Sequence, residues 1–492
     1  MIRRFSKSKK KTHKKKTHKK PLVIIIGGGV GGLSAAALLT LKNYKVIVLE
    51  KSSSGPAGCL SVFTSELSDW PVGIQFVGGN VGDPVSKFGK LMNKLTEGRQ
   101  KWLPNVPIDT IFVDKIFGFI PYHTKLQFHN RFNEEIQSLK DEYPSYASNI
   151  AKFDEHMKEL SSLLEDRINN PDSILPTETW ADVLDKCGIT NSILRKKISA
   201  IVSLGQLSID KASAIGFSWM INYYRNGSYY PIGGPQEISH NIEQTVKRHG
   251  GKVVYNALVE EVLINSGKVS GVRYTDSTTG QSKIIKASKV ISTIGAYNTY
   301  CKLFKDSPLF QDAKNEINSG KLPLSSSVYT VYLTLKNRKD GYPKEYIFNV
   351  DNPTEPILVM FGSERDPDYK NRHPNTSSAQ ISIVGIPFDL SNDNEEKDEI
   401  YKKRCLDYFE YHYPDYVDDI VETFTQNPHE LGQMLGSSLG ADYGVALIPE
   451  RVNNIWLKPK TSLNGFYMGG MDVFSPNLYG AILGSMSAVN FF

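Results

Sequence analysis

A glycine-rich turn near the start of the chain limits the possible folds more than any other feature. Residues 27–32 read Gly-Gly-Gly-Val-Gly-Gly and follow Leu22–Ile26, an uninterrupted apolar run that predicts a buried parallel strand. Gly27, Gly29 and Gly32 occupy the three glycine positions of GxGxxG. Such glycines allow a tight turn, a close approach of the backbone to a pyrophosphate, and packing of the next helix on the strand. The sequence therefore predicts a nucleotide-binding α/β fold.

The residues after this turn complete the pattern of a dinucleotide-binding unit. A predicted helix through residues 35–39 would direct its positive N-terminal end at a phosphate. A second apolar run at residues 46–49 predicts the next strand, and Glu50 follows it directly. An acid at this spacing accepts the ribose hydroxyls of adenosine. We therefore expect a nucleotide here; a glycine-rich loop without a ligand is the alternative.

The far end of the chain favours FAD over a nicotinamide as the bound cofactor. The sequence contains one GxGxxG fingerprint and no second one for a separate nicotinamide. Gly-Gly-Met-Asp at residues 469–472 follows a predicted strand at 466–468, and Tyr-Gly-Ala at 479–481 opens a closing helix that runs to Phe492. The flavin end of FAD needs a second anchoring loop far from the first, and these two segments can provide it.

The net charge of +6 belongs to the first twenty of the 492 residues. They contain eleven Lys and Arg, no acid, and Lys-Thr-His-Lys-Lys twice in succession at residues 11–20; the remainder has 47 basic and 52 acidic residues, a net charge of −5. A low-complexity basic segment repels itself and buries nothing, so we expect a disordered tail. Such a tail can bind polyanions, including an anionic membrane surface, or direct nuclear import; a passive extension is the alternative.

Cysteine usage and hydropathy predict a cytoplasmic protein without a membrane span. The four cysteines are far apart and form no CxxC or Cys/His cluster, which supports neither a disulfide framework nor a metal site. The uncharged run at residues 22–39 follows a basic stretch and resembles a signal anchor, but its five glycines disfavour a membrane helix. The tail leaves membrane association or a nuclear location as alternatives.

The rest of the chain predicts further helices and strands around the nucleotide-binding unit. Apolar residues at helical spacing predict helices over residues 84–96, 147–169 and 235–248, with more helix between 178 and 222. Asp83 is the expected N-cap and Pro84 the first-turn residue of the first of these helices. Apolar runs between turn signals predict strands at residues 252–255, 259–264, 269–274, 290–294, 328–335 and 381–386.

These elements predict a Rossmann-like, discontinuous FAD-binding domain with an inserted, mixed α+β substrate domain. The two strands at 328–335 and 381–386 are expected in a sheet on the substrate side. The predicted FAD-binding domain comprises residues 21–83, 230–300 and 455–492, and the substrate domain comprises 84–229 and 301–454, after the tail of residues 1–20.

Several motifs together resemble one known family. The most specific is Tyr-Tyr-Arg-Asn-Gly-Ser-Tyr-Tyr-Pro-Ile-Gly-Gly at residues 223–234. Other similar segments are residues 56–59, 73–78, 290–295, 363–367, 440–444 and 470–472. The chain after residue 21 thus resembles the carotenoid and retinoid oxidoreductases, especially the carotenoid isomerase and retinol saturase branch. It departs from the family at Ala57, where a second glycine is usual, and at Gln75, where histidine is frequent.

The resemblance implies FAD as cofactor, with NAD or NADP as an electron source. Asp472 would bind the ribityl or phosphate region, and the helix opening at Gly480 and Ala481 would direct its positive end at the pyrimidine side of the flavin. The predicted cofactor-binding residues are Gly27, Gly29, Gly32, Glu50, Lys51, Gly58, Val259, Gly470, Asp472, Gly480 and Ala481.

The resemblance also implies a hydrophobic polyene substrate, acted on by saturation, desaturation or isomerisation of double bonds. The candidate catalytic residues beside the flavin are Tyr230, Tyr443 and Gln75. Aromatic residues would suit a polyene channel, although core packing explains them equally well; they include Phe112, Phe117, Phe119, Tyr223, Tyr224 and Tyr229. The alternatives are a flavin amine oxidase and a non-catalytic escort that binds prenyl or other lipids on the same scaffold.

Overall fold

The computed structural model describes most of the chain after the basic tail. The described residues are 20–53, 55–56, 58–104, 110–114, 122–124, 132–199, 202, 205–343, 346–349, 355–386, 395–437 and 440–492. Residues 1–19 of the predicted tail, Ala57, Phe117 and Phe119 lie outside them, as does the side chain of Phe112.

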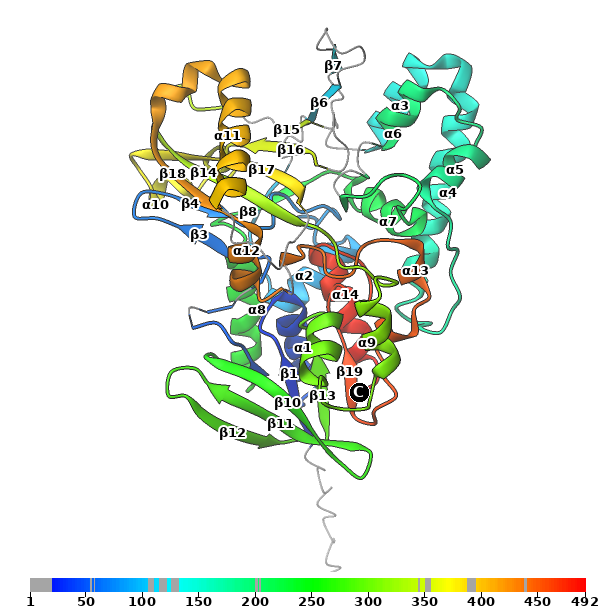
Figure 1. Ribbon diagram of the computed structural model, residues 1–492, viewed down its shortest axis with the longest axis vertical. Helices are drawn as coiled ribbons and strands as arrows, with labels where there is room; N and C mark the ends of the chain where they lie inside the picture. Colours follow the sequence, from blue (N-terminus) through cyan, green and yellow to red (C-terminus); the bar gives the residue numbers. More distant parts are fainter. Residues whose placement is uncertain are drawn as a thin grey trace, which may run out of the picture.

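A five-stranded parallel sheet forms the centre of the lower part of the molecule (Figure 1). Ile24 pairs with Ile47 on one side and Val290 on the other, which places the first predicted strand in the middle of the sheet. The strands, in spatial order, are β19 (Phe466–Met468), β13 (Lys289–Ser292), β1 (Leu22–Ile26), β2 (Lys45–Leu49) and β9 (Lys252–Val254).

Both faces of this sheet are covered, which explains why β1 is apolar without interruption. Val23 and Ile25 pack in a core formed by helices on one face, and Ile24 and Ile26 pack in a second core on the other. The helices of the first face are α1 (Val30–Leu41), α8 (Gln236–Arg248) and α14 (Leu478–Val489). The second face meets an antiparallel sheet of β10 (Ala257–Asn265), β11 (Lys268–Asp276) and β12 (Gln281–Lys286), with the π-helical η3 (Asn298–Leu303) and α9 (Gln311–Asn318).

A seven-stranded sheet lies above the parallel sheet in Figure 1. Val331 and Leu333 face helix α11 (Glu395–His412) and pack with Cys405 and Phe409. Alternate residues of the same strand point the opposite way, toward the cavity described below. The strands, in order, are β18 (Ile420–Gln426), β14 (Ser327–Lys336), β17 (Thr376–Ile386), β16 (Ile357–Met360), β15 (Tyr346–Asn349), β6 (Thr110–Asp114) and β7 (Tyr122–Thr124).

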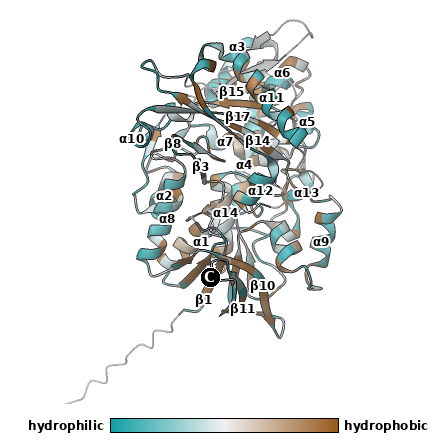
Figure 2. Cartoon of the chain, turned by 60° about the vertical axis from the view of Figure 1, so that its left-hand side comes forward, coloured by the Kyte–Doolittle hydropathy of each residue, from teal (hydrophilic) through white to brown (hydrophobic). Residues whose placement is uncertain are grey.

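A group of helices stands beside the seven-stranded sheet, at the upper right of Figure 1. It consists of α3 (Phe132–Glu142), α4 (Ala147–Asp166), α5 (Trp180–Lys186), α6 (Ser192–Ser199) and α7 (Ala214–Tyr224). Figure 2 shows hydrophilic residues on outer helices such as α5 and α8 and hydrophobic residues along β1 and β17.

Short elements connect these layers. Two small antiparallel ribbons pair β3 (Val62–Thr64) with β4 (Asp69–Pro71) and β5 (Trp102–Pro104) with β8 (Tyr229–Pro231). The remaining helices are α2 (Lys87–Thr96), α10 (Tyr369–Arg372), α12 (Pro428–Leu435), α13 (Pro449–Val452), η1 (Pro144–Tyr146), η4 (Gly362–Glu364), η5 (Pro414–Asp419) and η7 (Ile455–Leu457).

The predicted start of α2 was wrong. The helix begins at Lys87, and the hydroxyl of its N-cap Ser86 accepts a 2.9 Å hydrogen bond from the Gly89 N–H. The expected cap Asp83 instead accepts the Val85 N–H in a turn before the helix. Asp side chains readily form such local turns, which compete with capping.

The positions of the strands along the chain agree with a discontinuous nucleotide-binding unit. All five strands of the parallel sheet come from residues 21–83, 230–300 and 455–492, and all seven strands of the upper sheet come from 84–229 and 301–454. The domain boundaries themselves stay predictions. Within the described residues, no helix combines the length and the apolar character needed to cross a bilayer.

Candidate active site

A cavity of about 680 Å³ lies between the parallel sheet and the seven-stranded sheet. Its floor includes the residues at or just after the C-terminal ends of four parallel strands: Ile26, Leu49, Thr293 and Gly470. Open α/β sheets bind their ligands at this edge. The opposite wall carries Val328, Thr330, Leu358, Ser382 and Val384 from the seven-stranded sheet. The volume is in the usual range of small-molecule and cofactor sites.

The predicted fingerprint forms one end of this cavity. Gly27 and Gly29 line it, and Gly27 has a φ of +100°, which favours glycine. Gly32 does not line it, because its Cα faces the turn: a Cβ there would lie 2.0 Å from the Gly27 carbonyl oxygen. Gly29 is the N-cap of α1 and provides no side-chain cap. The first-turn N–H groups of α1 are therefore available to a phosphate.

Glu50 closes the same end from β2. Its buried carboxylate accepts the Gly28 N–H at 2.5 Å through Oε2 and the Ser52 N–H at 2.8 Å through Oε1. A carboxylate oxygen can accept more than one hydrogen bond, so these contacts leave acceptor capacity for ribose hydroxyls. Glu50 both lines the cavity and holds the glycine turn in place.

Three further predicted cofactor residues line the cavity from different elements: Lys51, Gly58 and Val259. The Lys51 ammonium donates to the Gln433 carbonyl at 2.9 Å, and burial lowers its pKa. Gly58 has a φ of +90°, and a Cβ there would lie 3.6 Å from the Gly29 Cα, so its loop lies against the fingerprint turn. Val259 contributes from β10.

Asp472 joins three chain segments at the other side of the floor. Its Oδ2 accepts the Ala296 N–H at 2.7 Å, and its Oδ1 accepts the Val445 N–H at 2.9 Å. A Cβ on Gly444 would lie 2.3 Å from Oδ1, so this approach requires glycine. Asp472 and Gly470 line the cavity, but both oxygens of Asp472 already hold backbone. Its predicted contact with the ribityl or phosphate region stays a prediction.

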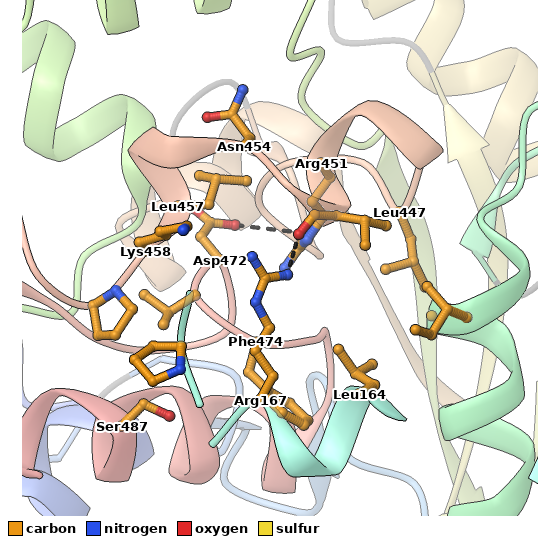
Figure 3. Close-up of a pocket in the computed structure, with 16 residues that line it drawn as sticks. Leu164, Arg167, Leu447, Arg451, Asn454, Leu457, Lys458, Asp472, Phe474 and Ser487 are labelled. Atoms are coloured by element: carbon orange, nitrogen blue, oxygen red, sulfur yellow. Dashed lines mark hydrogen bonds and ion pairs between the residues drawn. The ribbon is translucent and has the colours of Figure 1, made fainter. Parts of the chain in front are cut away.

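Two arginines lie behind Asp472, around a second and much smaller cavity of about 30 Å³ (Figure 3). Arg451 Nη1 lies 3.9 Å from Asp472 Oδ1, and its guanidinium donates to the Val445 and Met471 carbonyls. Arg167 donates to the Val452 carbonyl. Since this space is far smaller than a cofactor site, we interpret it as the packed support of the Asp472 loop.

The closing helix α14 begins at Leu478, one residue before the predicted opening at Tyr479, and ends at Val489 rather than at Phe492. Asn477 is its N-cap and accepts the Gly480 N–H at 2.9 Å. Gly480 does not line the cavity, and a Cβ there would lie 1.8 Å from the Ser475 carbonyl oxygen. Ala481 and Asn477 line the cavity instead. The Gly480 position is explained by packing, whereas the missed Asn477 faces the candidate site.

Of the three candidate catalytic residues, Gln75 and Tyr443 line the cavity and Tyr230 does not. Tyr230 is buried in β8, and burial followed by the charge of Asp366 raises the pKa of its phenol. Asp366 accepts the Gly233 N–H at 3.1 Å, and Arg372 binds Asp366 at 2.9 Å. The most specific motif of the resemblance therefore contributes a buried connection to residues 363–367.

Three buried polar atoms of cavity-lining residues have no hydrogen-bond partner within the described part of the chain: Gln75 Oε1, Ser437 Oγ and Asn477 Nδ2. Native proteins rarely leave such groups unpaired, so each one calls for an explanation. An acceptor, a hydroxyl and an amide donor in one cavity suit a ligand with both donors and acceptors, as FAD has. Together with the open α1 N-terminus, they show that the described residues fit this cofactor.

Sequence reasoning missed a polar cluster at the cavity wall. Asp442 lines the cavity, and burial raises the pKa of its carboxyl to about 7. Cys59 also lines it; burial, with a further contribution from the charge of Asp442, raises the pKa of its thiol to about 11. The only signal in the sequence was the position of Asp442 within the motif at residues 440–444. Among the described residues, no three His, Cys, Asp or Glu side chains group as a metal site would require.

Comparison with protein families gives two matches. Residues 121–488, about three quarters of the chain, match the family described as flavin containing amine oxidoreductase. Residues 25–73 match the NAD(P)-binding Rossmann-like domain.

Several curated proteins are similar in sequence. All-trans-retinol 13,14-reductase of Rattus norvegicus is 25% identical, over 94% of this chain and 84% of its own length. An inactive all-trans-retinol 13,14-reductase of Danio rerio has the same identity and coverage. The chloroplastic prolycopene isomerase of Daucus carota is 25% identical over 69% of this chain and 56% of its own.

Solved structures share the fold. An oxidoreductase from Methanosarcina mazei aligns with a TM-score of 0.64 and 18% identity, over 95% of this chain and all of its own. A putrescine oxidase bound to putrescine aligns with a TM-score of 0.63 and 16% identity, over 96% of this chain and 98% of its own. The Rossmann-like α/β prediction is confirmed, and so is the family resemblance of the sequence.

Proposed function

Because the chain belongs to the flavin-containing amine oxidoreductases, we propose that it is an FAD-dependent oxidoreductase that acts on double bonds of a hydrophobic polyene. Its activity would be most like that of all-trans-retinol 13,14-reductase, to which it is similar over 94% of its length. Saturation, desaturation and isomerisation are the three candidate reactions, and NAD or NADP is the proposed electron source for saturation.

One observation carries this proposal: a single cavity joins the nucleotide-binding edge to an apolar wall. Val328, Leu358 and Val384 project into it from the seven-stranded sheet, and Leu431 and Leu435 from α12. FAD supplies the hydride or electron chemistry once bound, so the protein needs to hold and shield the substrate. Gly29, Glu50 and the α1 N-terminus would hold the adenosine diphosphate part, and Asn477, Ser437 and Gln75 offer polar contacts farther along.

The cavity is less suited to an amine. An ammonium substrate needs a charged partner, because burying an unpaired cation costs several kcal/mol. The carboxyl groups among the described lining residues are Glu50, Asp442 and Asp472. Glu50 and Asp472 each hold two backbone N–H groups, and Asp442 has a pKa near 7. Amine oxidation remains the second candidate because the family name and the putrescine oxidase likeness favour it.

The experiment uses the full chain loaded with FAD. Under anaerobic conditions it is incubated with all-trans-retinol or an acyclic carotene, in the presence or absence of a reductant. The products are separated by chromatography and their masses are determined by mass spectrometry. Gain of two hydrogens indicates saturation, loss of two indicates desaturation, and an unchanged mass at a new retention time indicates isomerisation. Peroxide release from amines under air, with no polyene product, would establish the amine oxidase alternative.

A non-catalytic escort is the third candidate, and the inactive relative in Danio rerio shows why sequence identity does not decide it. An escort would bind the polyene and leave it unchanged with oxidised or reduced flavin. Retention of retinol fluorescence on the protein, with no product by mass, would identify this outcome.

For the basic tail, we propose binding to polyanions, with an anionic membrane surface as the partner of a polyene enzyme. Eleven basic residues in the first twenty give a strongly salt-dependent attraction. Vesicles with and without phosphatidylserine, tested with the full chain and with a chain lacking residues 1–20, measure it. Equal binding of the two chains would leave the tail as a passive extension; nuclear import is tested by fusing residues 1–20 to a reporter protein.

A further inference from the structure

Asp442 lies where three distant segments meet at the cavity wall. Its Oδ1 accepts the Ser325 hydroxyl at 3.0 Å, and its Oδ2 accepts the Gln206 amide at 2.8 Å. Ser325 precedes β14, Gln206 precedes α7, and Asp442 follows α12. Tyr443 N–H donates to the Ser325 oxygen at 3.0 Å, and the Ser326 carbonyl, at 3.2 Å, is a second acceptor for the Ser325 hydroxyl. The side chains that hold this carboxyl are neutral, whereas Asp472 has Arg451 at 3.9 Å.

We propose that Asp442 is the general acid that delivers a proton to the substrate carbon during saturation of a double bond. This inference rests on the proposed function and assigns a residue to it. The carboxyl lines the same cavity as the fingerprint glycines and the apolar wall, so a cofactor and a polyene bound in this cavity would share it with the acid.

The step balances in atoms and electrons. One carbon of the double bond receives a hydride from the reduced flavin, and the π bond breaks. The neighbouring carbon receives a proton as the O–H bond of Asp442 breaks. Asp442 becomes a carboxylate and regains its proton from water, and the flavin is reduced again by the two-electron donor, for which NADH or NADPH is proposed above.

The local environment keeps Asp442 in the form that can donate. Burial raises the pKa of its carboxyl to about 7, whereas the hydrogen bonds from Ser325 and Gln206 oppose this rise. Within the described residues, no Lys, Arg or His forms an ion pair with Asp442. The thiol of Cys59, whose pKa the charge of Asp442 raises, is neutral near pH 7. An acid with a pKa near the working pH transfers protons most effectively.

Gln206 supports the assignment through its backbone and its side chain. It has a φ of +62°, a conformation that is costly for a residue other than glycine and that tends to occur at functional sites. Its Oε1 is buried without a partner, while its Nε2 donates to Asp442. An amide next to a carboxyl can donate to the charged form and, after rotation, accept from the protonated form. Gln206 and Ser325 are thus positioning residues.

The other acidic groups of the cavity are worse candidates. Glu50 and Asp472 each use both carboxylate oxygens to accept backbone N–H groups, so each already holds a loop in place. The Cys59 thiol has a pKa of about 11, which makes it a weak acid for this step. Tyr443 lines the cavity and is the rival proton donor that the experiment must separate.

The test compares FAD-loaded wild type, Asp442→Asn, Tyr443→Phe and the control Ser326→Ala in single turnovers. Each protein is reduced without oxygen and mixed with all-trans-retinol, and flavin reoxidation and saturated product are followed. Asp442→Asn should slow both by about 10²- to 10⁴-fold, the usual contribution of a general acid, with FAD binding and reduction unchanged. Ser326→Ala should stay within about threefold of wild type, and Tyr443→Phe should lose less activity than Asp442→Asn.

A second readout needs no turnover. Infrared spectra of the flavin-free protein should show a carboxylic-acid C=O band that titrates near pH 7 and is missing in Asp442→Asn. A wild-type rate in Asp442→Asn, a larger loss in Tyr443→Phe, or absence of that band would overturn the assignment. If the wild type saturates no polyene, the proposed function is contradicted. Equal saturation rates in wild type and Asp442→Asn would instead contradict only the assignment of Asp442.

Discussion

The two ends of the cavity differ in how the chain builds them. The end proposed for adenosine comes from one stretch, since Gly27 and Gly29 lie in the turn after β1 and Glu50 directly follows β2. The end proposed for chemistry brings together Cys59, Gln206, Ser325 and Asp442, which are separated by more than a hundred residues at each step. Local spacing encodes the first end, and only tertiary packing creates the second.

The two ends also treat a carboxyl group in different ways. Glu50 accepts two backbone N–H groups, which fix the glycine turn. Asp442 is half-buried and accepts one hydroxyl and one amide; desolvation raises its pKa to about 7 although these hydrogen bonds oppose the rise. Environments that move carboxyl pKa values apart assign different roles to chemically similar groups. Here we expect Glu50 to bind the ribose hydroxyls of FAD and Asp442 to donate a proton to the substrate.

The largest effect should come from Gly32→Val, which breaks the adenosine end. A Cβ at residue 32 would lie 2.0 Å from the Gly27 carbonyl oxygen, and backbone cannot move away as a flexible side chain can. We expect complete loss of FAD binding and a fall of more than about 3 kcal/mol in the free energy of unfolding. Flavin absorbance after gel filtration and urea unfolding measure both.

Gly267→Asn is the matched control for that variant. Gly267 has a φ of +74°, which asparagine tolerates, and a Cβ there meets nothing within 4 Å. Normal FAD binding in Gly267→Asn with loss in Gly32→Val would locate the effect in the turn. Normal binding in both would mean that the fingerprint does not contact the cofactor.

Next in size is Glu50→Gln, which separates binding from chemistry. The amide nitrogen of Gln cannot accept the Gly28 or Ser52 N–H, and loss of such a buried contact costs about 1–3 kcal/mol. FAD affinity by calorimetry should fall about 5- to 150-fold. At saturating FAD the rate of polyene conversion should remain unchanged, and the exposed control Glu260→Gln should bind FAD like wild type. A large loss of rate at saturating FAD would contradict the division of roles.

The contrast between local spacing and tertiary packing also explains which features of the fold and the site the sequence could predict. β1 falls on the predicted residues 22–26, because a strand buried on both faces needs a continuous apolar run. The Asp83 cap was misplaced, because Asp83 accepts the Val85 N–H in a local turn while Ser86 accepts the Gly89 N–H and caps the helix. Asp442 could not be identified, because its burial and its partners Ser325 and Gln206 depend on the packing of three distant segments.

A third prediction uses the pH dependence of stability at the reactive end. The carboxyl of Asp442 has a raised pKa of about 7 in the folded protein, against about 3.9 when unfolded. Its contribution is therefore fully present below pH 4 and is lost as the pH rises to 7. A difference of about three pKa units sets an upper limit of about 4 kcal/mol on this contribution to the free energy of unfolding. Contact of the carboxyl with cavity water reduces the expected loss of stability to about 1–2 kcal/mol.

Urea unfolding of the flavin-free wild type and of Asp442→Asn between pH 4 and 8 measures this loss. The stability of wild type relative to the variant should fall across that range and level off above pH 7. A constant difference between pH 4 and 8 would show that Asp442 is charged in the folded protein and would contradict this prediction.

The smallest effect should come from Ser325→Ala, which alters Asp442 without touching the adenosine end. The Ser325 hydroxyl bonds to the carboxyl at 3.0 Å and holds its pKa down against burial. Its removal should therefore raise the pKa further, by roughly one unit or less, since a hydrogen bond to the charged form favours that form. The pH at which the saturation rate falls to half should move upward by the same amount, while FAD affinity stays unchanged. Ser326→Ala removes the neighbouring hydroxyl and should leave the profile in place; a shift in both variants, or a downward shift in Ser325→Ala, would mean that another group controls the pH dependence.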